Sequence, residues 1–196
     1  MACYHYESGS VMDELQYDIE EADIRIIPHI LYATEKGSEP VIVLSNDTDI
    51  LVLNLYYTEK FKRKGLKEIM QRCGIGNTTR YIPVHILADK LGRDMCKVLP
   101  ALHILTGCDM TSKVGTKCSG MKANPVQFLV TFGRSMSPTD SDIAQAEAFL
   151  VQVLQNGAPY ATMDELCYYI YFHAKNVTYS ELPPTSYCIH AHILCC

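Results

Sequence analysis

The sequence predicts an α/β fold with a mostly parallel sheet, followed by a helical part. Residues 41–44 (VIVL) form a short β-branched apolar run that ends in the polar residues SNDTD, as buried strands of parallel sheets do. Helix-like segments flank this run on both sides, and helical patterns dominate beyond about residue 110. These observations place polar residues at the carboxyl end of a strand, the usual ligand position in open α/β sheets.

Composition favours one globular domain. The chain has 196 residues, of which 48% are hydrophobic and 20% charged, so it can bury a core of its own and is not disordered. We expect a single domain over residues 1–196, with an α/β part over about 18–110 and a helical part over about 111–196. No apolar run reaches the roughly 18 residues of a membrane helix, and the first 14 residues lack the order of a secretory signal.

The cysteines indicate a reducing compartment. Nine of them are scattered without a CxxC pair or a disulfide-framework spacing, which is typical of reduced thiols. We therefore expect an intracellular protein of the nucleus or cytoplasm, with no membrane partner.

The elements are predicted by local patterns. Residues 20–37 begin with acids and end in glycine, as a helix does, although Pro28 should kink it or limit its regular part to the residues after the proline. A second helix (ILVLNLYY) leaves the strand. Strand-like pieces near 67–71 and 80–82, joined by a Gly/Asn/Thr turn, predict a hairpin. Further helices are expected over 85–91, over 94–105, and from Ser137-Pro138-Thr139-Asp140, with proline at the first helical position, to near Gly157.

Carboxylates gather in three segments. Hard cations such as Mg²⁺ and Mn²⁺ take oxygen ligands, so a phosphoryl-transfer site needs acids from separate parts of the chain. Asp47 and Asp49 follow the strand and point to one side if the chain stays extended there. Glu21 and Asp23 open a helix, and Asp109 lies in a polar break. The net charge of −5 decides little, because five acids belong to this set and bound cations would reverse the local field.

The order of these segments carries a resemblance. E-A-D (21–23), N-D-T-D (46–49) and L-T-G-C-D (105–109) are similar to the acidic segments of the PIN-like and flap-endonuclease superfamily. The chain resembles more closely a group of uncharacterised animal PIN-like proteins with the phrases EEAD, SNDTD, RYIP, LPALHxLTGCD and LPPT. Here these phrases stand at 20–23, 45–49, 80–83, 99–109 and 182–185, so the likeness spans nearly the whole chain.

The resemblance implies a three-layer α/β/α fold and a divalent-metal-dependent nuclease that hydrolyses DNA or RNA phosphodiesters. Its implied metal ligands are Glu21, Asp23, Asp47, Asp49 and Asp109, with Asp47, Asp49 and Asp109 as the catalytic set around two Mg²⁺ or Mn²⁺ ions. The densest basic run and two lysines near Asp109 are candidate phosphate contacts: Lys60, Lys62, Arg63, Lys64, Lys67, Lys113 and Lys117. A solvated surface loop is the competing interpretation of the run.

The sequence also departs from the superfamily. Nothing before Glu20 reads as a first strand ending in an aspartate, so we expect a chain truncated at both ends. Residues 112–122 keep only Gly115 and Lys117 of the glycine-rich DNA-gripping motif. A catalytically impaired module that binds nucleic acid or protein, derived from a mobile element, is therefore the alternative function.

For the remaining motifs we prefer structural roles to functional ones. Cys188, His190, His192, Cys195 and Cys196 could hold zinc, but their spacing matches no known finger. Cys108 is expected to be a buried thiol and no nucleophile. The histidines at 29, 85 and 103 are expected to lie in the core or on a helix face and not to be ligands. The tyrosines at 160, 168, 169 and 171 are expected to pack within the fold, although tyrosines can also stack on single-stranded bases.

Overall fold

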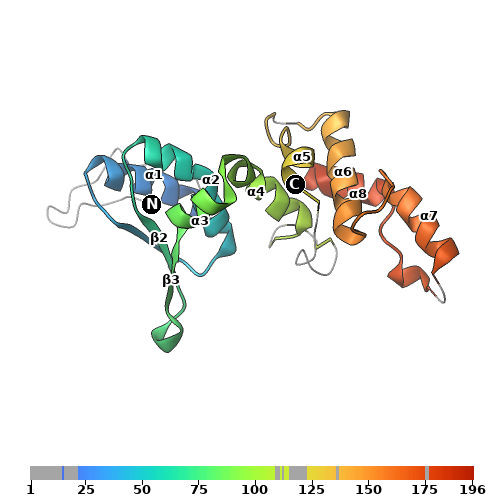
Figure 1. The fold of residues 1–196 in the computed structure, drawn as a ribbon, viewed down its shortest axis with the longest axis horizontal. Coiled ribbons are helices and arrows are strands. Elements are labelled where there is room, and N and C mark those ends of the chain that lie inside the picture. The colour runs from blue at the N-terminus through green and yellow to red at the C-terminus, as the bar shows by residue number, and fades with distance from the viewer. Residues whose placement is uncertain are drawn as a thin grey trace. The chain divides into compact units, whose positions relative to one another are not determined.

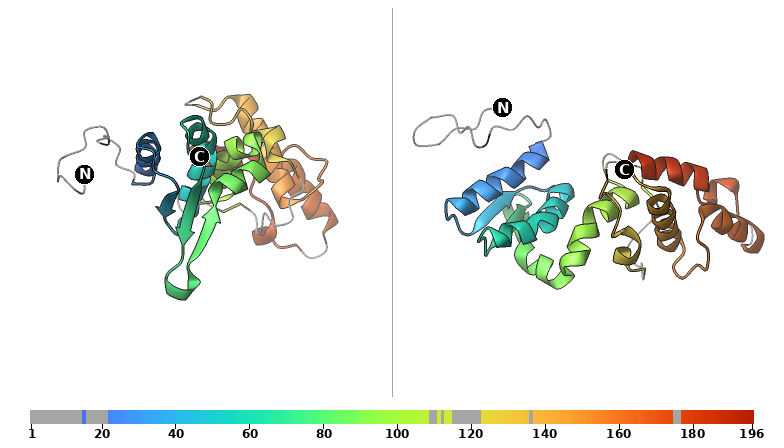
Figure 2. Two further views of the ribbon diagram at one scale, coloured as in Figure 1. Left: turned by 60° about the vertical axis from the view of Figure 1, so that its left-hand side comes forward. Right: turned by 90° about the horizontal axis from the view of Figure 1, so that it is seen from above.

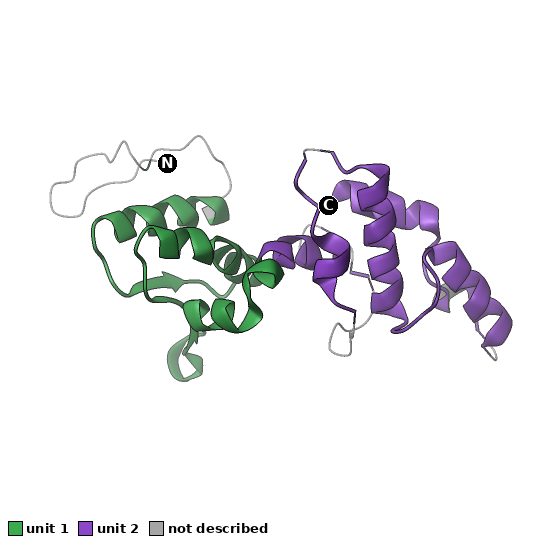
Figure 3. Ribbon diagram, turned by 45° about the horizontal axis from the view of Figure 1, so that its top comes forward, with its two compact units in different colours: residues 1–96 green, residues 97–196 purple. Residues whose placement is uncertain are grey.

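The computed structural model describes Leu15 and residues 22–108, 111, 113–114, 123–135, 137–174 and 177–196. Glu21, Asp109 and Lys117 lie outside these residues, as does most of the polar segment after Cys108. The chain divides into two compact units, residues 1–96 and residues 97–196 (Figure 3). Each unit is described by itself.

Unit 1 contains the α/β part. Its elements are α1 (Ala22–Glu35), β1 (Val41–Leu44), α2 (Thr48–Arg63), β2 (Ile69–Cys73), η2 (Gly76–Thr78), β3 (Arg80–Pro83) and α3 (Val84–Leu91), and α4 (Arg93–Thr106) begins in it (Figure 1). The strand after residue 40, the helix that leaves it and the hairpin are therefore confirmed. Proline at position 28 does not delay α1, which starts six residues before it.

The described strands form a three-stranded mixed sheet in the order β1-β2-β3. β1 and β2 are parallel, with Val41 opposite Ile69, whereas β2 and β3 are antiparallel, with Met70 opposite Pro83. The β2–β3 hairpin projects beyond the helices of this unit (Figures 1 and 2). A hairpin turn at Gly74 requires glycine, because φ is +83° there and a Cβ would lie 2.3 Å from the Thr78 carbonyl oxygen.

The two faces of the sheet differ in burial. Val43, Ile69, Gln71 and Cys73 share one face and are all buried, and α2 covers it because Asn54 of α2 hydrogen-bonds Gln71. On the opposite face Ile42 is 42% exposed and Leu44 68%. Burial of β1 on both faces, as expected for a central parallel strand, is therefore wrong: among the described residues, this strand is at the sheet edge with one open face.

The core of unit 1 lies between the helices and the covered face. α2 contacts both α1 and α3, so the three helices form one layer. Phe61, Leu55 and Ile50 of α2 are buried, with Val84 of α3 and Ile30 of α1. Burial of such apolar side chains drives this packing, at about 25 cal/mol per Å² of surface removed from water.

Unit 2 is helical in its described part, as the sequence predicts. After the rest of α4 come α5 (Pro125–Leu129), α6 (Asp140–Leu154), α7 (Met163–His173), η4 (Tyr179–Glu181) and α8 (Ser186–Cys195). α6 contacts α5, α7 and α8, and its Phe149, Leu150 and Val151 are fully buried. No helix in the described part of the chain is long and apolar enough to cross a membrane.

The start of α6 differs from expectation. Proline 138 is not the first helical residue; the helix begins at Asp140 with Thr139 as its N-cap. Thr139 and Asp142 form a reciprocal capping box, which satisfies backbone donors that the helix leaves unpaired. The cap therefore lies two residues later than the Ser-Pro pattern suggests.

Candidate metal centre

The DxD pair sits at the start of α2. Asp47 is the N-cap residue, with extended backbone at φ −78° and ψ 134°, and its Oδ1 accepts a hydrogen bond of 2.9 Å from the Asp49 amide. Asp49 is already helical, so the premise that the chain stays extended from 47 to 49 is wrong. The cap geometry places the Asp47 carboxylate against the Asp49 backbone amide, at a helix end that favours negative charge.

A buried side-chain amide hydrogen-bonds the backbone of the DxD loop, residues 45–49. Gln71 in β2 is 1% exposed, and its Nε2 donates to the Ser45 carbonyl (3.2 Å) and the Asp47 carbonyl (2.9 Å). Asn54, 0% exposed, donates from Nδ2 to Gln71 Oε1 at 3.4 Å. Because buried amides are rare without such partners, these two residues fix the backbone that carries Asp47.

Two further contacts tie the loop to the β2 end, and a third lies within the loop. The Cys73 thiol donates to the Ser45 carbonyl (3.1 Å), and the Gly74 amide donates to Asn46 Oδ1 (2.6 Å). Ser45 Oγ accepts from the Asp47 amide at 2.9 Å. We did not predict these supporting residues, although the polar Gln71 and Asn54 in otherwise apolar segments were a signal that could have found them.

The other predicted ligands are placed less fully. Asp23 lies half-buried in the first turn of α1, as expected for an acid that opens a helix. Glu21 and Asp109 lie outside the described residues, so their meeting with the DxD pair stays a prediction. Within the described ranges, no three His, Cys, Asp or Glu side chains gather closely enough to hold a metal ion.

The chain just before Asp109 is tightly folded. Gly107 has φ +112°, and a Cβ there would lie 2.5 Å from Lys113 Cα. Thr111 Oγ1 donates to the Ile104 carbonyl (2.7 Å), and the Val114 amide donates to the Thr106 carbonyl (3.2 Å). The described residues beyond Asp109 therefore fold back on the end of α4, which only glycine at 107 permits.

Asp47 and Asp49 could supply some of the oxygen ligands that a divalent cation needs. Asp47 and Asp49 are carboxylates at the surface, Asp47 exposed and Asp49 half-buried. One oxygen of Asp47 is engaged with the helix end, which leaves the other for a ligand. Two side chains are too few for the six oxygen ligands of Mg²⁺, so a cation at this loop would need further oxygen ligands.

The basic run is paired within unit 1. Each of four side chains lies against a carboxylate: Lys62 with Asp89, Arg63 with Glu59 at 2.5 Å, Lys64 with Glu35 at 3.0 Å and Lys67 with Glu39 at 3.4 Å. Lys60 Nζ lies 5.8 Å from the centre of the Tyr57 ring. To contact phosphate, these side chains would have to leave their carboxylate partners. Phosphate contact by the run, and by the exposed Lys113, stays a prediction.

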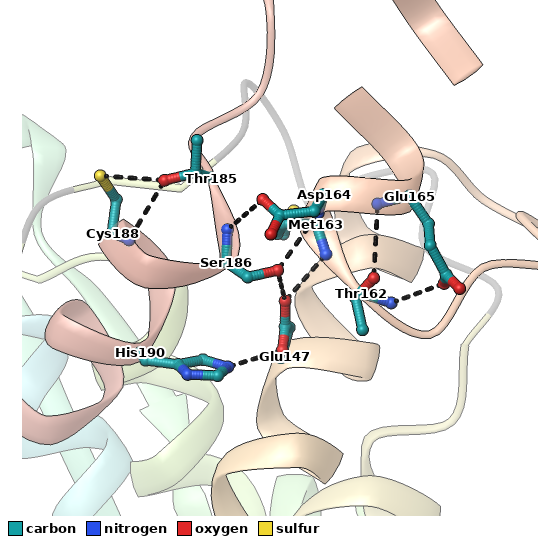
Figure 4. Close-up of polar contacts among 9 residues, drawn as sticks. All are labelled: Glu147, Thr162, Met163, Asp164, Glu165, Thr185, Ser186, Cys188 and His190. Atoms are coloured by element: carbon teal, nitrogen blue, oxygen red, sulfur yellow. Dashed lines mark hydrogen bonds and ion pairs between the residues drawn. The ribbon is translucent and has the colours of Figure 1, made fainter. Parts of the chain in front are cut away.

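Unit 2 has a polar centre of its own around Glu147 (Figure 4). Glu147 in α6 is 3% exposed and accepts from three donors: the Met163 amide (2.8 Å), Ser186 Oγ (2.5 Å) and His190 Nε2 (2.7 Å). Serine and histidine here both point to the acid, not to each other, so this is no nucleophilic triad. The centre joins α6 to the N-terminal ends of α7 and α8.

The C-terminal histidines diverge, as their spacing predicts. His190 contacts Glu147, whereas His192 Nε2 lies 3.0 Å from the Leu105 carbonyl. Burial raises the pKa of the Cys196 thiol to about 11, with a smaller contribution from the nearby Cys108. Cys108 itself is half-buried, with its sulfur 3.5 Å from Thr111 Oγ1.

The tyrosines of α7 separate into two groups. Tyr160, which precedes α7, and Tyr169 are half-buried, and their rings are tilted with centres 5.2 Å apart. Tyr168 and Tyr171 are 66% and 49% exposed, so the expectation that all four pack within the fold is wrong for these two.

Comparisons with known proteins return nothing: no family model, curated protein or solved structure matches this chain. The resemblance to PIN-like proteins therefore rests on the short sequence phrases alone.

Proposed function

We propose that this chain is a divalent-metal-dependent nuclease of the PIN-like type, acting on phosphodiester bonds of DNA or RNA. The observation that supports it best is the DxD loop: two surface carboxylates at the carboxyl end of a strand parallel to its neighbour, on a backbone clamped by buried Gln71. A loop that only solvates charge does not need a buried clamp, whereas ligand sites require such support. The full three-layer PIN-like arrangement belongs to the same proposal.

The acids of the candidate set would share one task. Asp47 and Asp49, with Asp23, Glu21 and Asp109, would hold two Mg²⁺ or Mn²⁺ ions, which in such sites generate the attacking water and stabilise the departing oxygen. The acids themselves would act as ligands, not as general bases. The Asp49 amide holds one Asp47 oxygen in place, so the other keeps a fixed direction.

The test is cleavage of labelled single-stranded and flapped oligonucleotides with Mn²⁺. We expect Asp47→Asn and Asp109→Asn each to reduce cutting by about a hundredfold or more, because each removes a ligand charge. Asp94→Asn is the matched control, since Asp94 is an exposed acid in the first turn of α4 that belongs to no candidate set. Equal cutting by all four proteins would end the enzymatic proposal.

A second candidate, a PIN-like module that binds without cutting, is favoured by one specific observation. Among the described strands, β1 is at the sheet edge, and no neighbouring strand contributes an acid beside Asp47. Manganese binding measured by electron paramagnetic resonance separates the two: a cutting enzyme binds Mn²⁺ in a way that Asp47→Asn weakens. Oligonucleotide binding that is unaffected by Mn²⁺ and by this substitution would favour the binding module.

A further inference from the structure

The open face of the sheet carries a row of three side chains next to the DxD loop. Leu44 pairs with Arg72, and Arg72 pairs with Tyr81, so the three lie side by side on one face across β1, β2 and β3. Leu44 is 68% exposed, Tyr81 53%, and Arg72 half-buried. The row is one residue from the candidate loop, because the Ser45 amide donates to the Arg72 carbonyl at 3.1 Å.

Arg72 differs from the basic run in its lack of a partner. Lys62, Arg63, Lys64 and Lys67 all contact carboxylates, but within the described part of the chain no carboxylate pairs with Arg72. Its Nε is buried and has no hydrogen-bond acceptor there. An unpaired guanidinium beside a loop of acids is complementary to an anion, and its planar donors suit phosphate oxygens.

Tyr81 adds a flat surface at the same place. A phenol ring that is half exposed on a sheet face can stack on a nucleobase, which needs the base to be free of a duplex. The apolar Leu44 and Ile42 extend this surface along β1 without any charge that would repel phosphate. Phosphate and base are thus served by adjacent side chains of one hairpin.

We propose that the open sheet face of unit 1 is a binding surface for single-stranded nucleic acid, with Arg72 on a phosphate and Tyr81 stacked on a base. The inference rests on the proposed nuclease function for its choice of ligand and goes beyond it in naming substrate class and contacts. It places the main nucleic-acid contact on the hairpin and not on the basic run at residues 60–67. The bound nucleic acid would then pass the DxD loop as it leaves the hairpin.

The experiment is fluorescence anisotropy of a fluorescein-labelled 20-nucleotide thymidine strand, with Ca²⁺ present and the strand checked for integrity afterwards. We expect Arg72→Gln and Tyr81→Ala each to weaken binding by about tenfold. Arg80→Gln is the matched control for arginine, because Arg80 lies on the same hairpin but faces the other side. Tyr187→Ala is the control for tyrosine, since Tyr187 is 83% exposed in unit 2.

The dependence on salt gives a second readout. Loss of one phosphate contact to a single strand should reduce the slope of log affinity against log salt by about 0.7, so Arg72→Gln should lower it and Arg72→Lys should not. This slope can be measured even if the variants are less stable, provided circular dichroism shows a folded fraction. An unchanged slope for Arg72→Gln would overturn the phosphate contact.

Other outcomes are equally decisive. Binding that is the same in all variants, no binding by the unmodified chain, or tighter binding of duplex without regard to Tyr81 would each overturn the inference. The inference would also be overturned by a Tyr81→Ala variant that is less stable but binds the oligonucleotide equally well. That result would mean that other parts of the protein cover this face. Strand binding that needs Arg72 and Tyr81 while nothing is cut would support the surface and defeat the nuclease proposal, so the two failures differ.

Discussion

The two units hold acidic side chains in opposite ways. In unit 1, Asp47 is exposed and Asp49 is half-buried. One carboxylate oxygen of Asp47 accepts a hydrogen bond from the backbone amide of Asp49. In unit 2, Glu147 is 3% exposed and its two oxygens are occupied by three donors from α7 and α8. Both sites use helix ends, but Asp47 is exposed whereas Glu147 is buried.

The difference teaches how to separate a structural acid from a candidate ligand. A buried carboxylate is tolerated only when its partners satisfy it fully, and it then has no capacity for another ligand. A surface carboxylate has that capacity, and it is useful only where its backbone is held by other groups, as Gln71 holds the DxD loop. Substitutions should accordingly affect stability at Glu147 and chemistry at Asp47.

The largest effect on stability should come from Glu147→Gln. The neutral amide loses the charge that strengthens three hydrogen bonds, and its nitrogen must face a donor or force His190 into its other tautomer, at a cost of about 3 kcal/mol. Urea unfolding followed by circular dichroism measures it. Asp47→Asn is the paired variant and should change the unfolding free energy by less than about 1 kcal/mol. Comparable losses at both acids would break the comparison.

Gly107→Ala should come next. It combines backbone strain at φ +112° with an approach of 2.5 Å to Lys113 Cα, and we expect a loss of about 2 kcal/mol. Gly133→Ala separates the two causes, because its φ is +78° but nothing lies within 4 Å of the added Cβ, so about 1 kcal/mol is expected. If Asp109 is a metal ligand, oligonucleotide cleavage should also fall in Gly107→Ala and not in Gly133→Ala. Equal thermal shifts in the two would remove the close-approach argument.

Gln71→Met tests the clamp under the loop. The two carbonyls of Ser45 and Asp47 and the Asn54 amide lose a partner, which should cost about 1–2 kcal/mol. Gln127→Met, at an exposed position of α5, should be nearly neutral. Manganese affinity should fall in the first variant and not in the second. A stable Gln71→Met protein with unchanged metal affinity would show that the loop holds its shape without the clamp.

Lys64→Gln should have a small effect. Its pair with Glu35 is half exposed on both sides and worth less than about 1 kcal/mol in unfolding experiments. If the basic run touches phosphate, this substitution must also reduce the salt slope for a single strand by about 0.7. An unchanged slope would favour the solvated-loop interpretation of residues 60–67.

The smallest effect is a stabilisation at Asp142 that is lost in acidic solution. Hydrogen bonds from Thr131 and then Thr139 lower the pKa of Asp142 from its usual range. The stabilisation is complete above the ordinary aspartate pKa of about 3.9 and disappears as the pH falls through the lower pKa of the folded state. Thermal melts of Asp142→Asn against the unmodified chain should differ at neutral pH and converge below that pKa. A constant gap across this range would contradict the assigned cause.

Some of the fold could be predicted because it depends on neighbours in the chain. The β-branched run at 41–44, the strand-like pieces joined by a Gly/Asn/Thr turn and the helical patterns of the later part are local signals, and each became the expected element. Errors arose where one residue was weighed alone: of the two alternatives for Pro28, a helix limited to the residues after it is wrong, and Thr139 caps α6 in place of Ser137. Helix ends are set by hydrogen bonds that a single residue type does not fix.

The sequence by itself determined the elements, their order and the acidic segments, because turn chemistry and hydrophobic period act over a few residues. Tertiary structure alone decided which partners they meet. Ser45 and Gln71 are 26 residues apart, Glu147 and His190 are 43 apart, and the open face of β1 depends on what else joins the sheet. Burial and hydrogen bonding depend on distances in space, which local patterns do not encode.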